Sequence, residues 1–299
     1  MKLNLKGGLG NQLFQYAYLH NYTLLKPDRN LEFVPDSTAR IDRPYELNDL
    51  IAFCDHAKKN VIKSSDVEPL SVISRNRERI LALLTHSLTS NPEGTELHER
   101  RGYQYSPPKL RHMAFDLPLS GYFQHWKYVE NVWTLIGPEI KLQLEAIDTH
   151  FQIMKEPKPQ MVLHIRGGDF HVESSTTGVL GSDYYLRALK SIEEKGAEIG
   201  VACILTDDLE FARNIVGQLN LAEYQILGPQ DCSAWEALLL MSGAKFLVTA
   251  NSTLSWWGAF LSEKRGGICV TPDPWHRNVP GNSTDALCYP GFLSVESEI

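Results

Sequence analysis

The sequence predicts an α/β fold made of two Rossmann-like domains with parallel sheets. Three observations support this prediction. Apolar strands alternate with amphipathic helices in both halves of the chain. Two prolines among charges in "KEPKPQ", residues 155–160, form a short and stiff connector that no helix can continue through. A chain of 299 residues also exceeds the usual size of a single core. We therefore expect one domain over residues 1–155 and a second over residues 156–299.

The first domain begins with a strand, "KLNL", a glycine loop, "KGGLGNQ", and a helix from about Gln12 to Lys26. The strand "LEFV" follows a Pro-Asp turn, and such a strand, helix and strand are the usual start of a parallel sheet. Between Tyr45 and about Pro108 the pattern weakens, apart from the helical stretch "SRNRERILALLTHSL". "LSGYFQHWKYVENVWTLI" then predicts a short strand and an aromatic helix.

The second domain alternates more regularly. Its expected strands are "MVLHIR", "VACILT", "KFLVTA" and, as the last strand of the chain, "GGICVT". Its expected helices are "YYLRALKSIEEKG", "LEFARNIVGQL", "WEALLLMSGA" and "LSWWGAFLSEK". Doubly wound sheets bind ligands outside the carboxyl ends of their strands. We therefore expect the functional residues in "KGGLGNQ" of the first domain and in "RGGDF", "TDD", "ANST" and "PDPWHRN" of the second.

The composition is that of an ordinary soluble globular protein, with 43% hydrophobic and 22% charged residues. The formal net charge of -7 gives no support to nucleic-acid binding. No D-x-D, H-E-x-x-H or His-Cys cluster occurs, so we expect no metal site. The cysteines are odd in number and have no C-x-x-C spacing, which favours a reducing cytoplasm over a disulfide framework. They are Cys54, Cys203, Cys232, Cys269 and Cys288.

Neither a signal peptide nor an apolar window of about 20 residues is present. We therefore expect a cytoplasmic location, with transient association at the inner face of the membrane left open. In the glycine loop, Gly8, Gly10 and Glu32 partly fit a dinucleotide fingerprint, but leucine replaces the third glycine. The loop is instead typical of a backbone that approaches a ligand, with the amides of Asn11 and Gln12 at a helix start. A capped tight turn is the alternative.

"HIRGGDF", residues 164–170, combines a guanidinium fork with the backbone amides of two glycines, which suits a pyrophosphate. Arg166 is the expected contact. His164 lies two residues earlier on the same face of the strand and suits a base or ribose. Asp169 is a candidate general base; alternatively it orients Arg166 or closes the loop. In "TDD", Asp208 either binds ribose or base donors together with its neighbour or caps the following helix.

"TANSTLSWWGAFLSEK" places Asn251, Ser252 and Thr253 at a helix start, where they either bind phosphate oxygens or cap the helix, or do both. Trp256 and Trp257 are adjacent, so we expect at most one to face the core completely. The other is then a candidate for stacking on a sugar or nucleobase, although core packing is the alternative for each.

Three motifs in this order, "GGLGNQLFQYA", "HIRGGD" and "ANSTLSWWGA", resemble the bacterial α-1,2-fucosyltransferases of glycosyltransferase family 11. The resemblance implies a GT-B-like fold with two facing domains, the first on the acceptor side and the second binding the GDP-sugar. It implies inverting transfer from GDP-L-fucose to the 2-hydroxyl of a β-galactoside, without a metal or other cofactor. The implied acceptor is a galactose-terminated oligosaccharide, such as a lipid-linked precursor.

By the same resemblance, the catalytic residues are Arg166, which neutralises the β-phosphate as GDP departs, Asp169 and Asn11. Glu236 lies near the position of a guanine-binding acid. One departure is that the second arginine of the family's H-x-R-R-G-D motif is Gly167 here. The full set of expected substrate-binding residues is Gly8, Gly10, Gln12, His164, Asp208, Glu236, Asn251, Ser252 and Thr253.

Two other classes stay open from the residues alone. A nicotinamide-dependent oxidoreductase is suggested by Gly8, Gly10 and Glu32, but the motifs of the second domain count against it. A non-catalytic sugar-binding module is suggested by the tryptophans, but it would not need an arginine loop suited to phosphate.

Overall fold

The computed structural model describes most of the second half of the chain and separate stretches of the first. The described residues are 2–25, 32–35, 45–50, 97–98, 105–107, 119–148, 159–168, 178–197, 200–277 and 283–298. The chain divides into two compact units, Met1–Gln143 and Leu144–Ile299, and the division falls within helix α4 (Trp126–Asp148). The boundary expected between residues 155 and 156 stays a prediction, because residues 149–158 lie outside the described part.

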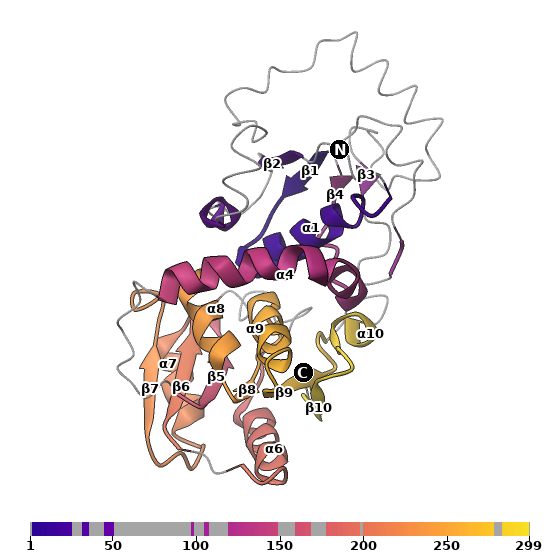
Figure 1. Ribbon diagram of the computed structural model, residues 1–299. Coiled ribbons are helices and arrows are strands. Elements are labelled where there is room, and N and C mark those ends of the chain that lie inside the picture. Colours follow the sequence, from indigo (N-terminus) through magenta and orange to yellow (C-terminus); the bar gives the residue numbers. More distant parts are fainter. Residues whose placement is uncertain are drawn as a thin grey trace. The chain divides into compact units, whose positions relative to one another are not determined.

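Within its described residues, the first unit contains a four-stranded parallel sheet with strand order β2-β1-β4-β3 (Figure 1). Because β1 pairs with β2 on one side and with β4 on the other, the strand order reverses between β1 and β4. The elements, followed in the chain by α4, are β1 (Lys2–Leu5), α1 (Leu9–His20), β2 (Glu32–Pro35), the 3-10 helix η1 (Glu46–Asp49), β3 (Leu97–His98) and β4 (Leu119–Ser120).

Helix α1 is buried along most of its length because its aromatic side chains pack within the first unit. Tyr18 stacks face to face on Phe123, with ring centroids 3.7 Å apart. The Asn21 side chain donates a hydrogen bond of 2.8 Å to the backbone carbonyl of Tyr128. These contacts fix α1 against the segment that follows β4 and the first turn of α4.

The second unit contains a six-stranded parallel sheet with strand order β7-β6-β5-β8-β9-β10, which is the order of a doubly wound Rossmann sheet. The elements are β5 (Met161–Ile165), α6 (Ser182–Glu193), β6 (Ala202–Thr206), α7 (Leu209–Val216), β7 (Tyr224–Leu227), α8 (Ala234–Gly243), β8 (Phe246–Val248), α9 (Thr253–Glu263), β9 (Ile268–Asp273), α10 (Ser283–Leu287) and β10 (Leu293–Glu296).

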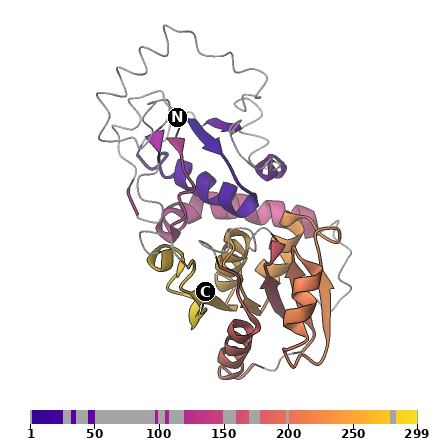
Figure 2. The ribbon, with the colours of Figure 1, turned by 180° about the vertical axis from the view of Figure 1, so that it is seen from behind.

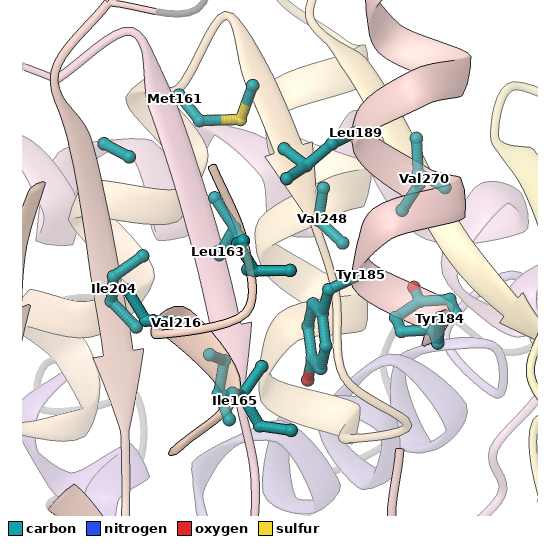
Figure 3. Close-up of a cluster of buried hydrophobic side chains, with 14 of the residues drawn as sticks. Met161, Leu163, Ile165, Tyr184, Tyr185, Leu189, Ile204, Val216, Val248 and Val270 are labelled. Carbon is teal, nitrogen blue, oxygen red and sulfur yellow. The ribbon is translucent and has the colours of Figure 1, made fainter. Parts of the chain in front are cut away.

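One face of this sheet packs against α6 and α7. Alternate residues of β5, namely Met161, Leu163 and Ile165, point to that face and are completely buried (Figure 3). There they belong to a hydrophobic cluster with Tyr185 of α6 and Val216 of α7. Because side chains alternate along a strand, this arrangement follows directly from the apolar run "MVLHI".

The other face of the sheet carries α8 and α9, which lie in front of it in Figure 1 and behind it in Figure 2. The buried thiol of Cys269 on β9 lies 3.3 Å from the backbone carbonyl oxygen of Ala259 on α9. Cys203 on β6 is also buried. Burial raises the pKa of both thiols, Cys203 and Cys269, to about 12. These two cysteines are therefore structural, as their place in strands predicts.

The predicted α/β class is confirmed, since each unit contains a parallel sheet. The prediction that "GGICVT" is the last strand is wrong, because β10 follows it and pairs with β9. Strand β7 was not predicted either. Both strands lie at the edges of the sheet and are largely exposed, so neither has the apolar run of a buried strand. The helical stretch expected in residues 74–88 lies outside the described residues.

No described helix combines the length and the apolar character that crossing a bilayer requires.

Candidate active site

The candidate site of the second unit lies where the strand order reverses, between β5 and β8. The two strands pair in parallel from Met161 opposite Phe246 to Leu163 opposite Val248. Their carboxyl ends therefore lie side by side. The topology thus brings "RGG" after β5 next to "ANST" at the start of α9, two motifs that are distant in the sequence. Ligands of doubly wound sheets bind at this place.

Arg166 is held by a carboxylate from the neighbouring strand. Its Nε lies 3.1 Å from Oδ2 of Asp207, which follows β6, and both side chains are mostly buried. The other oxygen of Asp207 accepts a hydrogen bond of 3.0 Å from the backbone amide of Gly167. One carboxylate therefore orients the guanidinium and the loop that carries it. The sequence offered Asp169 as an alternative for this orienting role, but Asp169 lies outside the described residues and its role stays a prediction.

Both glycines after Arg166 are required by close neighbours. A Cβ added to Gly167 would lie 2.7 Å from Cδ1 of Phe211, and one added to Gly168 would lie 2.5 Å from Oδ2 of Asp207. Such short contacts force a neighbouring group to move. Gly167 thus allows Phe211 of α7 to pack on the loop. A side chain at position 167, such as the arginine of the motif that the sequence resembles, would meet this ring.

His164 is a buried, uncharged imidazole at the end of β5. Only 5% of the residue is exposed, and within the described part of the chain its Nδ1 has no hydrogen-bond partner. Burial, and next the charge of Arg166, lowers the pKa of His164 to about 3. The ring is therefore neutral at pH 7 and cannot serve as a cation for phosphate. A neutral ring suits the predicted contact with a base or ribose, which stays a prediction.

Helix α9 begins at the same place, with Ser252 as its N-cap residue. The Ser252 side chain makes no capping hydrogen bond to the first turn, and the residue is 7% exposed. Behind it, Oγ1 of the buried Thr249 has no hydrogen-bond partner among the described residues. The Asn251 side chain donates a 3.1 Å hydrogen bond to the carbonyl of Gly178 and so fixes the loop between β8 and α9. A helix start without a side-chain cap favours an anionic ligand. Contacts of Ser252 and Thr253 with substrate stay predictions.

Two acids that the sequence offers for substrate contact cap helices. Oδ1 of Asp208 accepts a 3.0 Å hydrogen bond from the amide of Phe211 at the start of α7. Oε2 of Glu236 accepts a 2.7 Å hydrogen bond from the amide of Ser233, in a capping box at the start of α8. For Asp208 the capping alternative is thus observed. For Glu236 the spacing in "SAWE" could have indicated the capping box. Their substrate contacts stay predictions.

Trp256 and Trp257 are both completely buried, so the expectation that at most one faces the core completely is wrong. Helix α9 is buried nearly all around from Ser255 to Ser262, and therefore adjacent side chains both find a packed environment. Nε1 of Trp256 also donates a 2.7 Å hydrogen bond to the carbonyl of Leu287 in α10. Neither ring is exposed for stacking on a sugar.

In the first unit, the glycine loop supports Asn11. Gly7 has φ +78°, and a Cβ on it would lie 2.3 Å from Nδ2 of Asn11. Oδ1 of Asn11 accepts a 2.7 Å hydrogen bond from Nε2 of Gln124, beyond β4. Asn11 is therefore held at the point where the strand order of this sheet reverses. Its predicted catalytic role stays a prediction.

The start of α1 is already occupied by a carboxylate, because the amide of Leu9 donates to Glu46 of η1. A negative group here competes with any phosphate for the helix N-terminus. Gly8 is the N-cap residue and Gly10 lies buried in the first turn; their contacts with substrate stay predictions.

Gln12 is 1% exposed, and both ends of its amide bind backbone groups. Its Nε2 donates a 2.8 Å hydrogen bond to the carbonyl of Gly7, and its Oε1 accepts a 3.2 Å hydrogen bond from the amide of Leu47. These two hydrogen bonds support the glycine loop, and a contact of Gln12 with substrate stays a prediction.

Comparison with known proteins places these motifs in one family. The family model described as Glycosyl transferase family 11 matches residues 99–281. The O-antigen biosynthesis glycosyltransferase WbnK of Escherichia coli is 29% identical, and the match covers 97% of this chain and 99% of that protein. The alpha-1,2-colitosyltransferase of Escherichia coli is 26% identical, with 98% and 97% covered.

Among solved structures, the fucosyltransferase NodZ from Bradyrhizobium matches 87% of this chain and 91% of its own, with 13% identity and a TM-score of 0.45. The family model covers more than half of the chain and includes the loop of Arg166 and Asp207 together with the start of α9. The protein is therefore a glycosyltransferase that belongs to glycosyl transferase family 11.

Proposed function

We propose that the protein transfers L-fucose, with inversion, from GDP-L-fucose to the 2-hydroxyl of a β-galactoside. The observation that carries the proposal is the arrangement of Arg166 on Asp207 beside the start of α9, where Ser252 leaves the first turn without a side-chain cap. A guanidinium and a helix N-terminus at one switch point suit a sugar-nucleotide pyrophosphate. The name of the colitosyltransferase relative supports an α-1,2 linkage.

The chemistry requires charge stabilisation on the leaving group. As the bond between the sugar and the diphosphate breaks, negative charge grows on the β-phosphate, while the acceptor hydroxyl attacks the anomeric carbon from the opposite face. A preorganised guanidinium at that phosphate lowers the barrier more than it strengthens substrate binding. Asp207 supplies the preorganisation because it fixes Arg166 before the donor binds.

The remaining roles follow from burial and position. The neutral His164 suits a hydrogen bond to the ribose or base of the donor, and Asp169 is the proposed general base for the acceptor hydroxyl. We propose that no metal or cofactor is needed beyond the donor itself. The proposed acceptor is a galactose-terminated oligosaccharide, and the name of the relative WbnK, an O-antigen biosynthesis glycosyltransferase, supports a polysaccharide precursor.

A second donor sugar, L-colitose, is the alternative suggested by one relative's name. Colitose lacks only the 3-hydroxyl of fucose, so the two donors share the nucleotide and most of the sugar. Steady-state rates with GDP-L-fucose and GDP-L-colitose at equal concentrations distinguish them. A kcat/KM that is higher for the colitose donor would replace fucose in the proposal and leave the rest unchanged.

The direct test is incubation with GDP-L-fucose and lactose, followed by linkage analysis of the product. We expect fucose on the 2-hydroxyl of galactose. In parallel, thermal unfolding with GDP, UDP and ADP tests the donor nucleotide, and only GDP is expected to raise Tm clearly. Stabilisation by UDP or ADP but not GDP would contradict the proposed donor. Transfer to another hydroxyl would contradict the linkage.

A further inference from the structure

Tyr122 is an exposed aromatic side chain in an otherwise buried segment of the first unit. It is 44% exposed, whereas Ser120, Phe123 and Gln124 are only 2%, 3% and 8% exposed. The segment follows β4 directly and lies where the strand order reverses between β4 and β1 (Figures 1 and 2). This ring therefore reaches the surface while its neighbours in the segment are buried.

The backbone next to Tyr122 is strained. Phe123 has φ +52°, a left-handed conformation that bulky side chains rarely adopt. It is held there because its ring stacks on Tyr18 and its carbonyl accepts a 2.9 Å hydrogen bond from the amide of His125. The turn buries Phe123 and leaves the preceding side chain outside. Strain that is maintained by surrounding contacts occurs preferentially at ligand sites.

The Tyr122 ring is also held in place and bordered by polar groups. The ammonium group of Lys6 lies over one face of the ring, 5.3 Å from its centroid, and donates a 3.0 Å hydrogen bond to Oγ of Ser120. Two residues beyond the ring, Gln124 donates to Asn11 of the glycine loop. The segment after β4 thus carries one exposed aromatic ring with an ammonium group over one face, and its buried Gln124 connects it to Asn11.

This combination fits a hexopyranose. A β-galactoside has one face lined with C–H bonds, because its axial 4-hydroxyl points to the other face, and it has hydroxyls around the rim. We propose that the face of the Tyr122 ring opposite Lys6 stacks on the C–H face of the acceptor galactose, with Asn11 on the side of the rim hydroxyls. A tyrosine suits this role because it loses little conformational freedom on binding. The choice of galactose as the sugar rests on the proposed function.

Two readouts test the proposal. Steady-state kinetics with lactose and GDP-L-fucose measure KM for each substrate, and saturation-transfer NMR with lactose and GDP measures galactose contact without turnover. For Tyr122→Ala we expect KM for lactose to rise roughly tenfold, KM for GDP-L-fucose to stay unchanged, and the NMR signals of the galactose C–H face to disappear. Tyr122→Phe should restore both. The matched control is Tyr224→Ala, a change to a tyrosine on β7 that is 49% exposed.

The outcomes separate this inference from the proposed function. Normal transfer with an unchanged lactose KM in Tyr122→Ala overturns the inference alone. No transfer from GDP-L-fucose by the wild type, together with galactose signals that depend on Tyr122, overturns the proposed function alone. Absence of galactose signals in the wild type, or their loss in Tyr224→Ala as well, also overturns the inference.

Discussion

Asp207 binds both the side chain of Arg166 and the backbone of the loop that carries Arg166. One carboxylate oxygen lies 3.1 Å from the guanidinium Nε, and the other accepts a hydrogen bond from the amide of Gly167. The two residues come from adjacent strands, β5 and β6, so the sheet itself sets their separation. An arginine that is fixed in this way needs no reorganisation when charge develops on a leaving group. The proposed reaction can therefore be tested by changing either residue of the pair separately.

The first prediction concerns the fork of Arg166. Arg166→Lys keeps the positive charge but loses the planar set of donors that a phosphate binds. We expect kcat to fall by at least about a hundredfold, the typical loss for one transition-state donor, while the free energy of unfolding changes little. Turnover assays and urea unfolding measure the two quantities.

The control for this prediction is Arg187→Lys, which changes a half-buried arginine whose ion pair with Glu298 is 2.8 Å long. Its activity should remain at the wild-type level. An Arg166→Lys enzyme with near-normal kcat would rule out the proposed role of the guanidinium.

The second prediction concerns Asp207. Asp207→Asn keeps an acceptor for the Gly167 amide but removes the charge that orients the guanidinium. We expect kcat to fall roughly tenfold to a hundredfold, with less change in KM for the donor, because misdirected groups act mainly in the transition state. Asp231→Asn is the matched control, since Asp231 accepts a similar backbone hydrogen bond, 2.7 Å from Gly228, after β7. Equal losses in both variants would indicate a purely structural effect.

The third prediction concerns the contact between Gly167 and Phe211. A Cβ at position 167 would lie 2.7 Å from the Phe211 ring, so Gly167→Ala should destabilise the fold by about 1–3 kcal/mol. Phe211→Ala creates space, and the double variant should lose at least about 0.5 kcal/mol less than the sum of the single variants. Urea unfolding of the three variants measures this coupling. Gly200→Ala, where nothing lies within 4 Å of an added Cβ, is the control. Strict additivity would contradict the contact.

Much of the second unit could be predicted from the sequence, because its central strands are buried on both faces and read as apolar runs. The strand "MVLHI" and the Arg166 loop after it are examples. The edge strands β7 and β10 escaped prediction because exposed strands carry no such run. The burial of both Trp256 and Trp257 was missed for the opposite reason, since periodicity cannot show that a helix is covered on all sides.

The candidate site was predictable only as a set of loops. Position after a strand was enough to select Arg166 and Ser252. The partner of Arg166 was not predictable, because Asp207 and Asp208 are adjacent acids. Asp207 forms the ion pair and Asp208 caps α7 only because their side chains point in different directions. The structural role of Gln12 depends on η1, which lies in a polar stretch without periodicity. Tyr122 carries no sequence signal beyond its aromatic ring.

The last prediction uses His164 as a measure of pH dependence. Burial lowers its pKa from 6.5 to about 3, so between these values the unfolded chain binds a proton that the folded protein excludes. The protein therefore loses stability as pH falls below 6.5, by about 2 kcal/mol between pH 8 and pH 5 from this group alone. His164→Gln removes that contribution. Urea unfolding of wild type and variant at both pH values isolates it, because the other groups titrate alike in each. An equal loss in the two proteins would show that His164 takes up a proton in the folded state as readily as in the unfolded chain.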